Sequence, residues 1–192
     1  MTNVIFTIGH STRTIGEFAG LLRENGVDLV VDVRSIPRSR ANPQFNGDGL
    51  GEALATWGIG YEHIAELGGR RGRRRGAAPS QNAFWQVAGF RNYADYALTA
   101  PFASGLAQLR ERSLRHRCAI MCAEAVWWRC HRSIIADYLR AAGESVLHIL
   151  GPAHVEEARM TPAAVVQEDG TLIYPAEGTE RSPLATMGGS QG

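Results

Sequence analysis

The chain has 192 residues, of which 44% are hydrophobic and 20% are charged, and these values fit one globular domain with a full core. It carries 20 basic and 19 acidic side chains, which excludes a strongly basic protein and leaves only local clusters to indicate a nucleic-acid partner. Three cysteines, no zinc-finger spacing and no apolar leader predict a cytoplasmic protein without structural disulfides. No apolar run approaches the roughly 20 residues that cross a bilayer, so we expect no membrane partner.

The first half of the chain predicts strands that alternate with helices. Thr14 and Glu17 form a capping-box pair, which favours a helix start shortly after the first apolar run. Gly26 and Gly58 are typical of positions that follow the end of a helix. The predicted elements are a strand at residues 4–8, a helix from residue 15, a strand at residues 29–33, a short helix around residues 50–57 and a strand at residues 61–64.

The second half continues this alternation and ends in a hairpin. Pro101 fits the first turn of a helix, and Asp169 with Gly170 fits a two-residue hairpin turn. The predicted elements are helices at residues 84–98 and 101–112, a strand at residues 118–121, a helix that includes residues 134–139, a strand at residues 146–150 and a hairpin at residues 165–174.

This order of elements predicts a three-layer α/β fold, with a mainly parallel sheet, helices on both faces and a C-terminal β-hairpin. We expect residues 1–175 to form a single domain. The glycine, serine and threonine content of residues 176–192 predicts a flexible tail.

Polar side chains follow several predicted strands at the point where each strand ends. They lie at residues 9–11, 34–35, 63 and 122–124. Because the carboxyl ends of parallel strands share one edge of a sheet, we expect these segments to meet there. Ligands of open α/β sheets bind at this edge, so the sequence predicts a cleft with polar walls.

Five short motifs in a fixed order resemble one bacterial family. They are Thr7–Thr12, Asp32–Arg40, Tyr61–Gly69, Cys122–Glu124 and Cys130–Arg132. The similarity covers nearly the whole chain up to about residue 174, and it is to the uncharacterised family called domain of unknown function 488. The resemblance implies a compact cytosolic α/β domain and marks the motif residues as the site, but it implies no particular activity.

Cys122 lies where a predicted strand runs into a loop before a helix. Nearby cations and free N–H groups stabilise a thiolate at such a position, so Cys122 is a candidate nucleophile. Glu124 and His10 are the other candidate catalytic residues. Arg129 follows one residue too late for the Cys-x5-Arg spacing of phosphatases. The alternatives are a small buried cysteine and a Glu124 carboxylate that pairs with a nearby arginine.

Several arginines lie near the same edge and near the start of the following helix. Guanidinium groups bind phosphate or carboxylate bidentately, and a helix start offers free N–H groups to an anion. We therefore expect a small anionic or nucleotide-like ligand, with solvated or internally paired arginines as the alternative. The candidate anion-binding residues are Ser11, Arg34, Arg38, Arg129, Cys130, His131 and Arg132, with Arg40 close by in the sequence.

Thiol and imidazole groups also gather in this region. Cys122, Cys130 and His131 form an alternative site for zinc or iron. Cys130 and His131 are adjacent, however, and neither a CxxC nor an HxxxH spacing occurs, so the sequence requires no metal or other cofactor. His131 also fits the apolar face of the predicted helix, where it would be a core histidine.

An arginine-rich loop follows the third predicted strand and contains Arg70, Arg71, Arg73, Arg74 and Arg75. Flexible basic loops of this type contact nucleic-acid backbones without reading sequence. A solvated loop without a partner is the alternative, and the near-neutral total charge favours it.

Three functions remain open from the sequence. The first is an enzyme that acts on a phosphate-bearing or nucleotide-like substrate at the carboxyl edge of the sheet, by a reaction that the sequence does not indicate. The second is a nucleic-acid-binding module that uses the arginine-rich loop. The third is a thiol-dependent or metal-dependent sensor or enzyme built on Cys122, Cys130 and His131.

Overall fold

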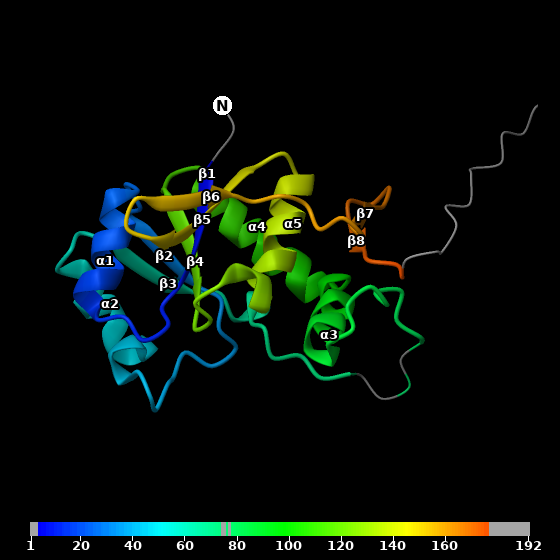
Figure 1. Cartoon of the computed structure of the whole chain (residues 1–192), viewed down its shortest axis with the longest axis horizontal. Coiled ribbons are helices and arrows are strands. Elements are labelled where there is room, and N and C mark those ends of the chain that lie inside the picture. Colours follow the sequence, from blue (N-terminus) through cyan, green and yellow to red (C-terminus); the bar gives the residue numbers. More distant parts are fainter. Residues whose placement is uncertain (1–3, 74–75, 77, 177–192) are drawn as a thin grey trace, which may run out of the picture.

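A computed structural model describes residues 4–73, 76 and 78–176. Its centre is a six-stranded sheet in the order β3-β2-β4-β1-β5-β6 (Figure 1). Every strand pair from β3 to β5 is parallel, and β6 pairs antiparallel with β5. The strands are β1 (Val4–Gly9), β2 (Leu29–Asp32), β3 (Gly60–His63), β4 (Cys118–Cys122), β5 (Ser145–Gly151) and β6 (His154–Glu157).

Helices cover both faces of this sheet, with α1 and α2 on one side and α3, α4 and α5 on the other (Figure 1). They are α1 (Ile15–Glu24), α2 (Gly47–Ala55), α3 (Ala88–Ala97), α4 (Ala100–Ser113) and α5 (Arg132–Ala141). A short antiparallel pair, β7 (Val165–Val166) and β8 (Leu172–Ile173), follows the sheet. The predicted three-layer α/β fold with a C-terminal hairpin is thus confirmed.

The side chains of β4 alternate between the two cores. Cys118, Ile120 and Cys122 face the core beneath α3, α4 and α5, whereas Ala119 and Met121 face the core beneath α1 and α2. A strand that is buried on both faces reads as a continuous apolar run, as this one does. The alternation directs Cys122 towards the side of the sheet on which α5 lies.

The predicted helix cap and the predicted hairpin turn are both present in the structure. The Thr14 hydroxyl accepts a hydrogen bond from the Glu17 N–H (3.2 Å), and the Glu17 carboxylate accepts one from the Thr14 N–H (2.7 Å). Gly170 has a φ of 81°, which suits glycine in the turn between β7 and β8. These contacts set the start of α1 and the register of the hairpin.

One predicted helix start was wrong, and one strand was missed. The helix predicted at residues 84–98 begins only at Ala88, because the preceding segment pairs with the C-terminal hairpin: the Phe84 N–H donates to the Tyr174 carbonyl (3.0 Å), and the Asn82 side chain accepts from the Tyr174 N–H (2.9 Å). The edge strand β6 was not predicted, since its exposed residues show no apolar alternation.

The predicted tail lies outside the described residues, apart from residue 176. Over the described ranges, no helix has both the length and the apolar character that crossing a membrane requires.

The order of the strands places a topological switch point at β1 and β4. The chain leaves β1 towards α1 and β2, and it leaves β4 towards α5 and β5, on the opposite face and in the opposite direction. Such a switch point, at the carboxyl ends of adjacent parallel strands, is where open α/β sheets bind ligands. A ligand site is therefore expected at the loops that follow β1 and β4.

Candidate functional site

A cavity of about 620 Å³ opens at this switch point. Its wall is formed by the loops after β1, β2, β3 and β4 together with the start of α3 and the residues before α5. Most of the residues predicted to form a site line it, namely His10, Arg34, Arg38, Cys122, Glu124, Arg129, Cys130 and His131. Ser11 and Arg132 do not belong to the lining: Ser11 lies beside it, and Arg132 lies beneath it.

The loop after β4 is held directly against β1. The backbone N–H groups of His10 and Ser11 donate to the carbonyls of Cys122 (2.9 Å) and Ala123 (3.0 Å). A Cβ atom on Gly9 would lie only 1.8 Å from the Glu124 carbonyl oxygen, so only glycine permits this approach. The glycine of the first motif therefore places the cysteine-bearing loop at the floor of the cavity.

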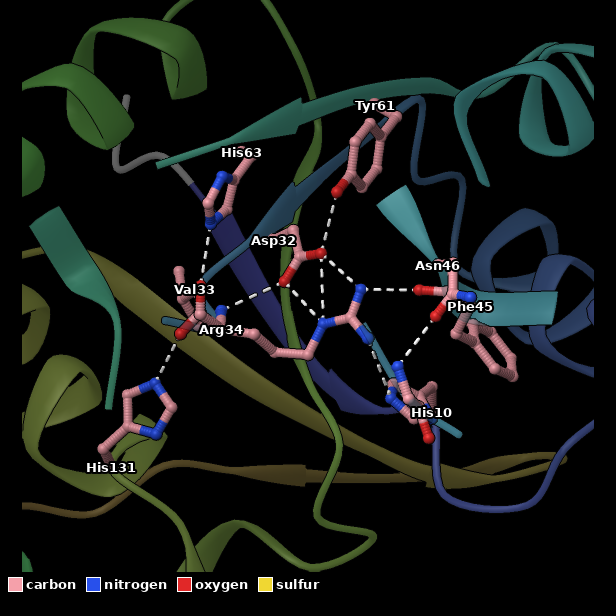
Figure 2. A network of polar contacts seen from close by, with 10 residues as sticks. His10, Asp32, Val33, Arg34, Phe45, Asn46, Tyr61, His63 and His131 are labelled. Carbon is pink, nitrogen blue, oxygen red and sulfur yellow. Dashed lines mark hydrogen bonds and ion pairs between the residues drawn. The ribbon is translucent and has the colours of Figure 1, made fainter. Parts of the chain in front are cut away.

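Arg34 is neutralised by a buried carboxylate (Figure 2). Its Nε and Nη2 groups donate to Asp32 at 2.9 and 2.6 Å, and Nη2 also donates to the Phe45 carbonyl at 2.7 Å. The Tyr61 hydroxyl donates to the same carboxylate at 2.8 Å, and burial, aided by the charge of Asp32, raises the pKa of Tyr61 so that it keeps its proton. Arg34 is thus mainly a structural cation and not a free ligand for an anion.

His10 is held as a neutral ring above this ion pair. Its Nδ1–H donates to the Ser11 carbonyl (2.9 Å), which leaves Nε2 to accept from Arg34 Nη1 (3.3 Å). The ring stacks on Phe45 with 4.3 Å between centroids. Burial lowers the pKa of His10, a shift that the hydrogen bond to Ser11 opposes and the charge of Arg34 supports. With Nε2 engaged by Arg34, His10 shapes the cavity wall in this state.

Cys122 and Cys130 meet at the floor of the cavity, with their Sγ atoms 2.7 Å apart. Cys130 immediately precedes the first turn of α5, and its sulfur lies 3.5 Å from the Arg132 backbone N–H and 3.4 Å from His131 Nδ1. Both thiols are almost fully buried.

The environment separates the acidities of the two thiols. Burial and the hydrogen bond to Cys130 raise the pKa of Cys122 well above its ordinary value. Burial also acts to raise the pKa of Cys130, but the hydrogen bond from Cys122 and the neighbouring His131 and Arg132 outweigh it and hold that pKa well below the ordinary thiol value. Of the two thiols in contact, Cys130 is therefore the one whose thiolate form the surroundings favour.

Arg132 is a buried cation that lies near the two cysteines and pairs with no carboxylate among the described residues. It is 1% exposed, and its Nη2 and Nη1 groups donate to neutral oxygens, the Glu124 carbonyl (2.6 Å) and the Thr7 hydroxyl (3.4 Å). Among the residues that the structure describes, no carboxylate pairs with it, and its Nε has no hydrogen-bond partner. An unpaired buried charge is strongly destabilising. A thiolate at Cys130 would offset this cost, because Arg132 acts to lower the pKa of Cys130, and the two cysteines act to raise the pKa of Arg132 against the effect of burial.

His148 does not supply the missing charge. Its Nδ1 lies 2.7 Å from the Thr7 hydroxyl, and its ring stacks on Trp127 at 4.5 Å. Burial, with a smaller contribution from Arg132, lowers the pKa of His148 to about 4, so the ring is neutral near pH 7. The buried cation therefore faces a neutral histidine on one side and the two cysteines on the other.

His131 is fixed from both sides. Its Nε2–H donates to the Val33 carbonyl (2.8 Å), which leaves Nδ1 facing Cys130, and Tyr93 packs against the ring at 5.0 Å (Figure 2 shows the bond to Val33). A Cβ atom on Gly69 would lie 2.3 Å from His131 Nδ1. The Leu-Gly-Gly motif thus leaves the space that the His131 ring occupies.

Replacing Gly69 by alanine is expected to displace the His131 ring and to lower the free energy of unfolding by about 1–3 kcal/mol, through overpacking and loss of the bond to Val33. Gly72→Ala is the matched control, because a Cβ atom there meets nothing within 4 Å. Urea unfolding of both variants measures the difference. Equal stabilities would show that the loop yields without moving His131.

Comparison with known protein families gives one match. A family model described as "Domain of unknown function DUF488" matches residues 14–139, which is more than half of the 192-residue chain. The chain belongs to this family. Comparison with curated proteins and with solved structures gives no significant match. The family description of this DUF488 domain assigns no activity.

The remaining charged residues of the DUF488 cavity are not paired in the way the sequence suggested. Glu124 is exposed, and no ion pair joins its carboxylate to an arginine in the described part of the chain, because Arg34 is bound by Asp32 and Arg132 reaches only the Glu124 backbone. The alternative in which the Glu124 carboxylate pairs with an arginine is therefore not seen among the described residues. Arg38 pairs with Asp48 at the surface (3.0 Å).

Three other guanidinium groups on the cavity wall, those of Arg40, Arg70 and Arg129, have no ion pair with any described residue. They come from the loop after β2, the loop after β3 and the loop before α5. These are the cations of the DUF488 cavity that remain available to a ligand.

The described arginines of the arginine-rich loop in this DUF488 domain make different contacts. Arg71 donates to the carbonyls of its own loop at Gly68 (2.9 Å) and Ala65 (2.8 Å) and stacks over Tyr96 at 3.7 Å. Arg70 lines the cavity, whereas Arg73 lines a separate hollow of about 390 Å³. Arg74 and Arg75 lie outside the described residues. Nucleic-acid binding by this loop stays a prediction.

The alternative metal site has poor geometry. Two sulfur ligands of one tetrahedral zinc ion lie about 3.8 Å apart, because each Zn–S bond is about 2.3 Å long. Cys122 and Cys130 are closer than this, with their sulfurs in direct contact at 2.7 Å. Within the described ranges, no group of three or more His, Cys, Asp or Glu residues has the arrangement of a metal site.

The apolar part of the cavity was missed from the sequence. Ile36, Val87 and Phe90 line it, and Ile36 and Val87 remain 57% and 64% exposed, so they offer apolar surface to a ligand. Val87 and Phe90 lie at the start of α3, far along the chain from the motif residues. No local pattern marks them, since exposed apolar residues beside a helix start are common.

Proposed function

We propose that this DUF488 domain is an enzyme that binds a small phosphate-bearing substrate in the cavity and attacks it with the Cys130 thiolate. One observation carries the proposal: the cavity joins a buried sulfur, whose pKa the nearby Arg132 acts to lower, to three guanidinium groups that form no ion pair with any described residue. A reactive anion at the floor and free cations on the wall are what a nucleophilic enzyme for an anionic substrate needs.

In this proposal, the anion binds to the three cavity arginines that form no ion pair with any described residue. Arg40, Arg70 and Arg129 approach the cavity from three different loops, so a phosphate between them would receive charge-assisted hydrogen bonds from several directions. Ile36, Val87 and Phe90 provide an apolar surface for the organic part of the substrate. This combination fits a substrate with one anionic end and one apolar or aromatic end, such as a nucleotide.

The proposed reaction begins with nucleophilic attack by the Cys130 sulfur. Cys130 donates an electron pair to the electrophilic atom of the substrate, and the leaving group departs with the electrons of the broken bond. Water then hydrolyses the covalent intermediate, and Glu124, whose exposed carboxylate lines the cavity without an ion pair, accepts the proton from that water. The nucleophile in this proposal is Cys130, because its surroundings lower its pKa, whereas burial and the hydrogen bond with Cys130 raise the pKa of Cys122.

The anion site is tested with inorganic pyrophosphate. Replacing Arg129 by alanine is expected to weaken pyrophosphate binding about 10-fold or more, since a hydrogen bond to a charged group contributes about 1.5–3 kcal/mol. Titration calorimetry measures the affinity. Arg115→Ala is the matched control, because Arg115 is an exposed arginine just before β4, at the opposite edge of the sheet.

A second readout links the anion to the nucleophile. Bound pyrophosphate should slow the alkylation of Cys130 by iodoacetamide, because both would occupy the same cavity. Arg129→Ala should remove this protection, and Arg115→Ala should retain it. Equal pyrophosphate affinity in all three proteins, or binding without protection of Cys130, would contradict the proposal.

A further inference from the structure

Two of the three cysteines are placed as a reactive pair and the third is not. Cys122 ends β4 and Cys130 precedes α5, and the loop between them brings the two sulfurs into contact at the cavity floor. Cys118 lies at the other end of β4, where its sulfur faces the His116 carbonyl (3.7 Å) and burial raises its pKa to about 12. Anion binding alone gives no reason for a second thiol beside the nucleophile.

We propose that Cys130 and Cys122 form a peroxide-reducing dithiol, in which a small hydroperoxide oxidises Cys130 and Cys122 resolves the product into an intramolecular disulfide. The inference rests on the Cys130 thiolate of the proposed function, but it does not depend on the anionic substrate. It assigns Cys122 the role of resolving cysteine, for which direct sulfur contact is the requirement.

The reaction proceeds in two balanced steps. The Cys130 thiolate attacks one peroxide oxygen, the O–O bond breaks, and the departing oxygen takes a proton to leave as water or an alcohol, so that Cys130 becomes a sulfenic acid. The Cys122 sulfur then attacks the Cys130 sulfur, the S–O bond breaks, and the hydroxide leaves as water with the Cys122 proton. The two sulfurs together lose two electrons to the peroxide, and an added dithiol returns them by disulfide exchange.

Arg132 makes this disulfide easy to reduce. Disulfide formation removes the thiolate that balances the buried guanidinium, and the described residues offer Arg132 no carboxylate in its place. A reduced form that is stabilised in this way gives a more oxidising disulfide. The arrangement therefore suits a disulfide that turns over and not one that holds the fold together.

The test treats the full-length protein with one equivalent of hydrogen peroxide and maps the cysteines by mass spectrometry after digestion. The expected product is one linkage between Cys122 and Cys130, a mass lower by two hydrogens and a free Cys118. Dithiothreitol should restore three thiols, and repeated additions should consume peroxide each time. This experiment needs no variant, so it stands even where a substitution disturbs folding.

Variants separate the roles of the two sulfurs. Cys122→Ser should stop at a sulfenic acid on Cys130 that dimedone traps, whereas Cys118→Ala, the matched control, should form the same disulfide as the wild type. Oxidation of the three cysteines at equal rates, disulfides only between chains, or an unchanged product in Cys122→Ser would overturn the inference.

The outcomes also distinguish this inference from the proposed function. If pyrophosphate fails to bind but the Cys122–Cys130 disulfide forms, the anionic substrate is wrong and the dithiol stands. If pyrophosphate protects Cys130 from iodoacetamide but peroxide yields no Cys122–Cys130 disulfide, the dithiol is wrong and the anion site stands.

Discussion

Replacing Asp32 by asparagine is expected to lower the free energy of unfolding by about 3–5 kcal/mol, because it leaves the charge of Arg34 buried without its counter-ion. Asp32 is 0% and Arg34 7% exposed, and the carboxylate also accepts from the Tyr61 hydroxyl and from the Arg34 backbone N–H (3.0 Å). An amide cannot replace this set, since it carries no charge and has a single acceptor oxygen. Urea denaturation followed by circular dichroism measures the loss.

The chain contains a matched control for this change. Asp48 also pairs with an arginine, but Arg38 and Asp48 are 71% and 82% exposed, so Asp48→Asn is expected to change stability by less than about 1 kcal/mol. The double variant Asp32→Asn, Arg34→Met should recover part of the loss, because it removes the buried charge as well. Similar small effects at both aspartates would mean that the buried network is not what holds the loop after β2.

Replacing Cys130 by serine is expected to slow the alkylation of the protein at pH 6 by roughly 10-fold to 100-fold. An ordinary thiol, with a pKa of about 8.5, is less than about 1% ionised at that pH, whereas the pKa of Cys130 is held well below the ordinary value, although burial opposes the shift. The rate of iodoacetamide reaction as a function of pH measures the effect. Cys118→Ala should leave the profile unchanged, because its thiol is not ionised in this range.

Arg132→Met tests the cause of this acidity. Without the buried guanidinium the Cys130 thiolate loses its counter-charge, so the midpoint of the alkylation profile should move to higher pH. An unchanged midpoint would assign the low pKa to the helix start and His131 instead.

The same shift links stability to pH. A thiol whose pKa is lower in the folded than in the unfolded state adds stability fully above the unfolded value of about 8.5, and this stability is lost as the pH falls through the folded pKa. Wild type should therefore lose more stability than Cys130→Ser between pH 9 and mildly acidic pH. Parallel unfolding curves for the two proteins would show that Cys130 is not ionised in the folded state.

Much of the site was predictable because its residues follow strand ends in the sequence. Runs of apolar residues located β1, β2 and β4, and the parallel order of the sheet brought His10, Arg34 and Cys122 to one edge. Glycines in the motifs were recognised, but their use was not, since the contact of Gly69 with His131 joins segments more than 60 residues apart.

The sequence by itself determined the order of the elements, the fold class and the edge at which the polar residues gather, because helix and strand signals act over a few neighbouring residues. Only the tertiary structure decided which arginines form ion pairs, since Arg34 pairs with Asp32 whereas Arg132 pairs with no carboxylate in the described part of the chain. It also placed Cys130 where the contacts with Cys122, His131 and Arg132 act to lower its pKa against the effect of burial. The physical reason is that charge balance and acidity depend on the distances between side chains in space and on their burial, which a sequence pattern does not record even for neighbours such as Asp32 and Arg34.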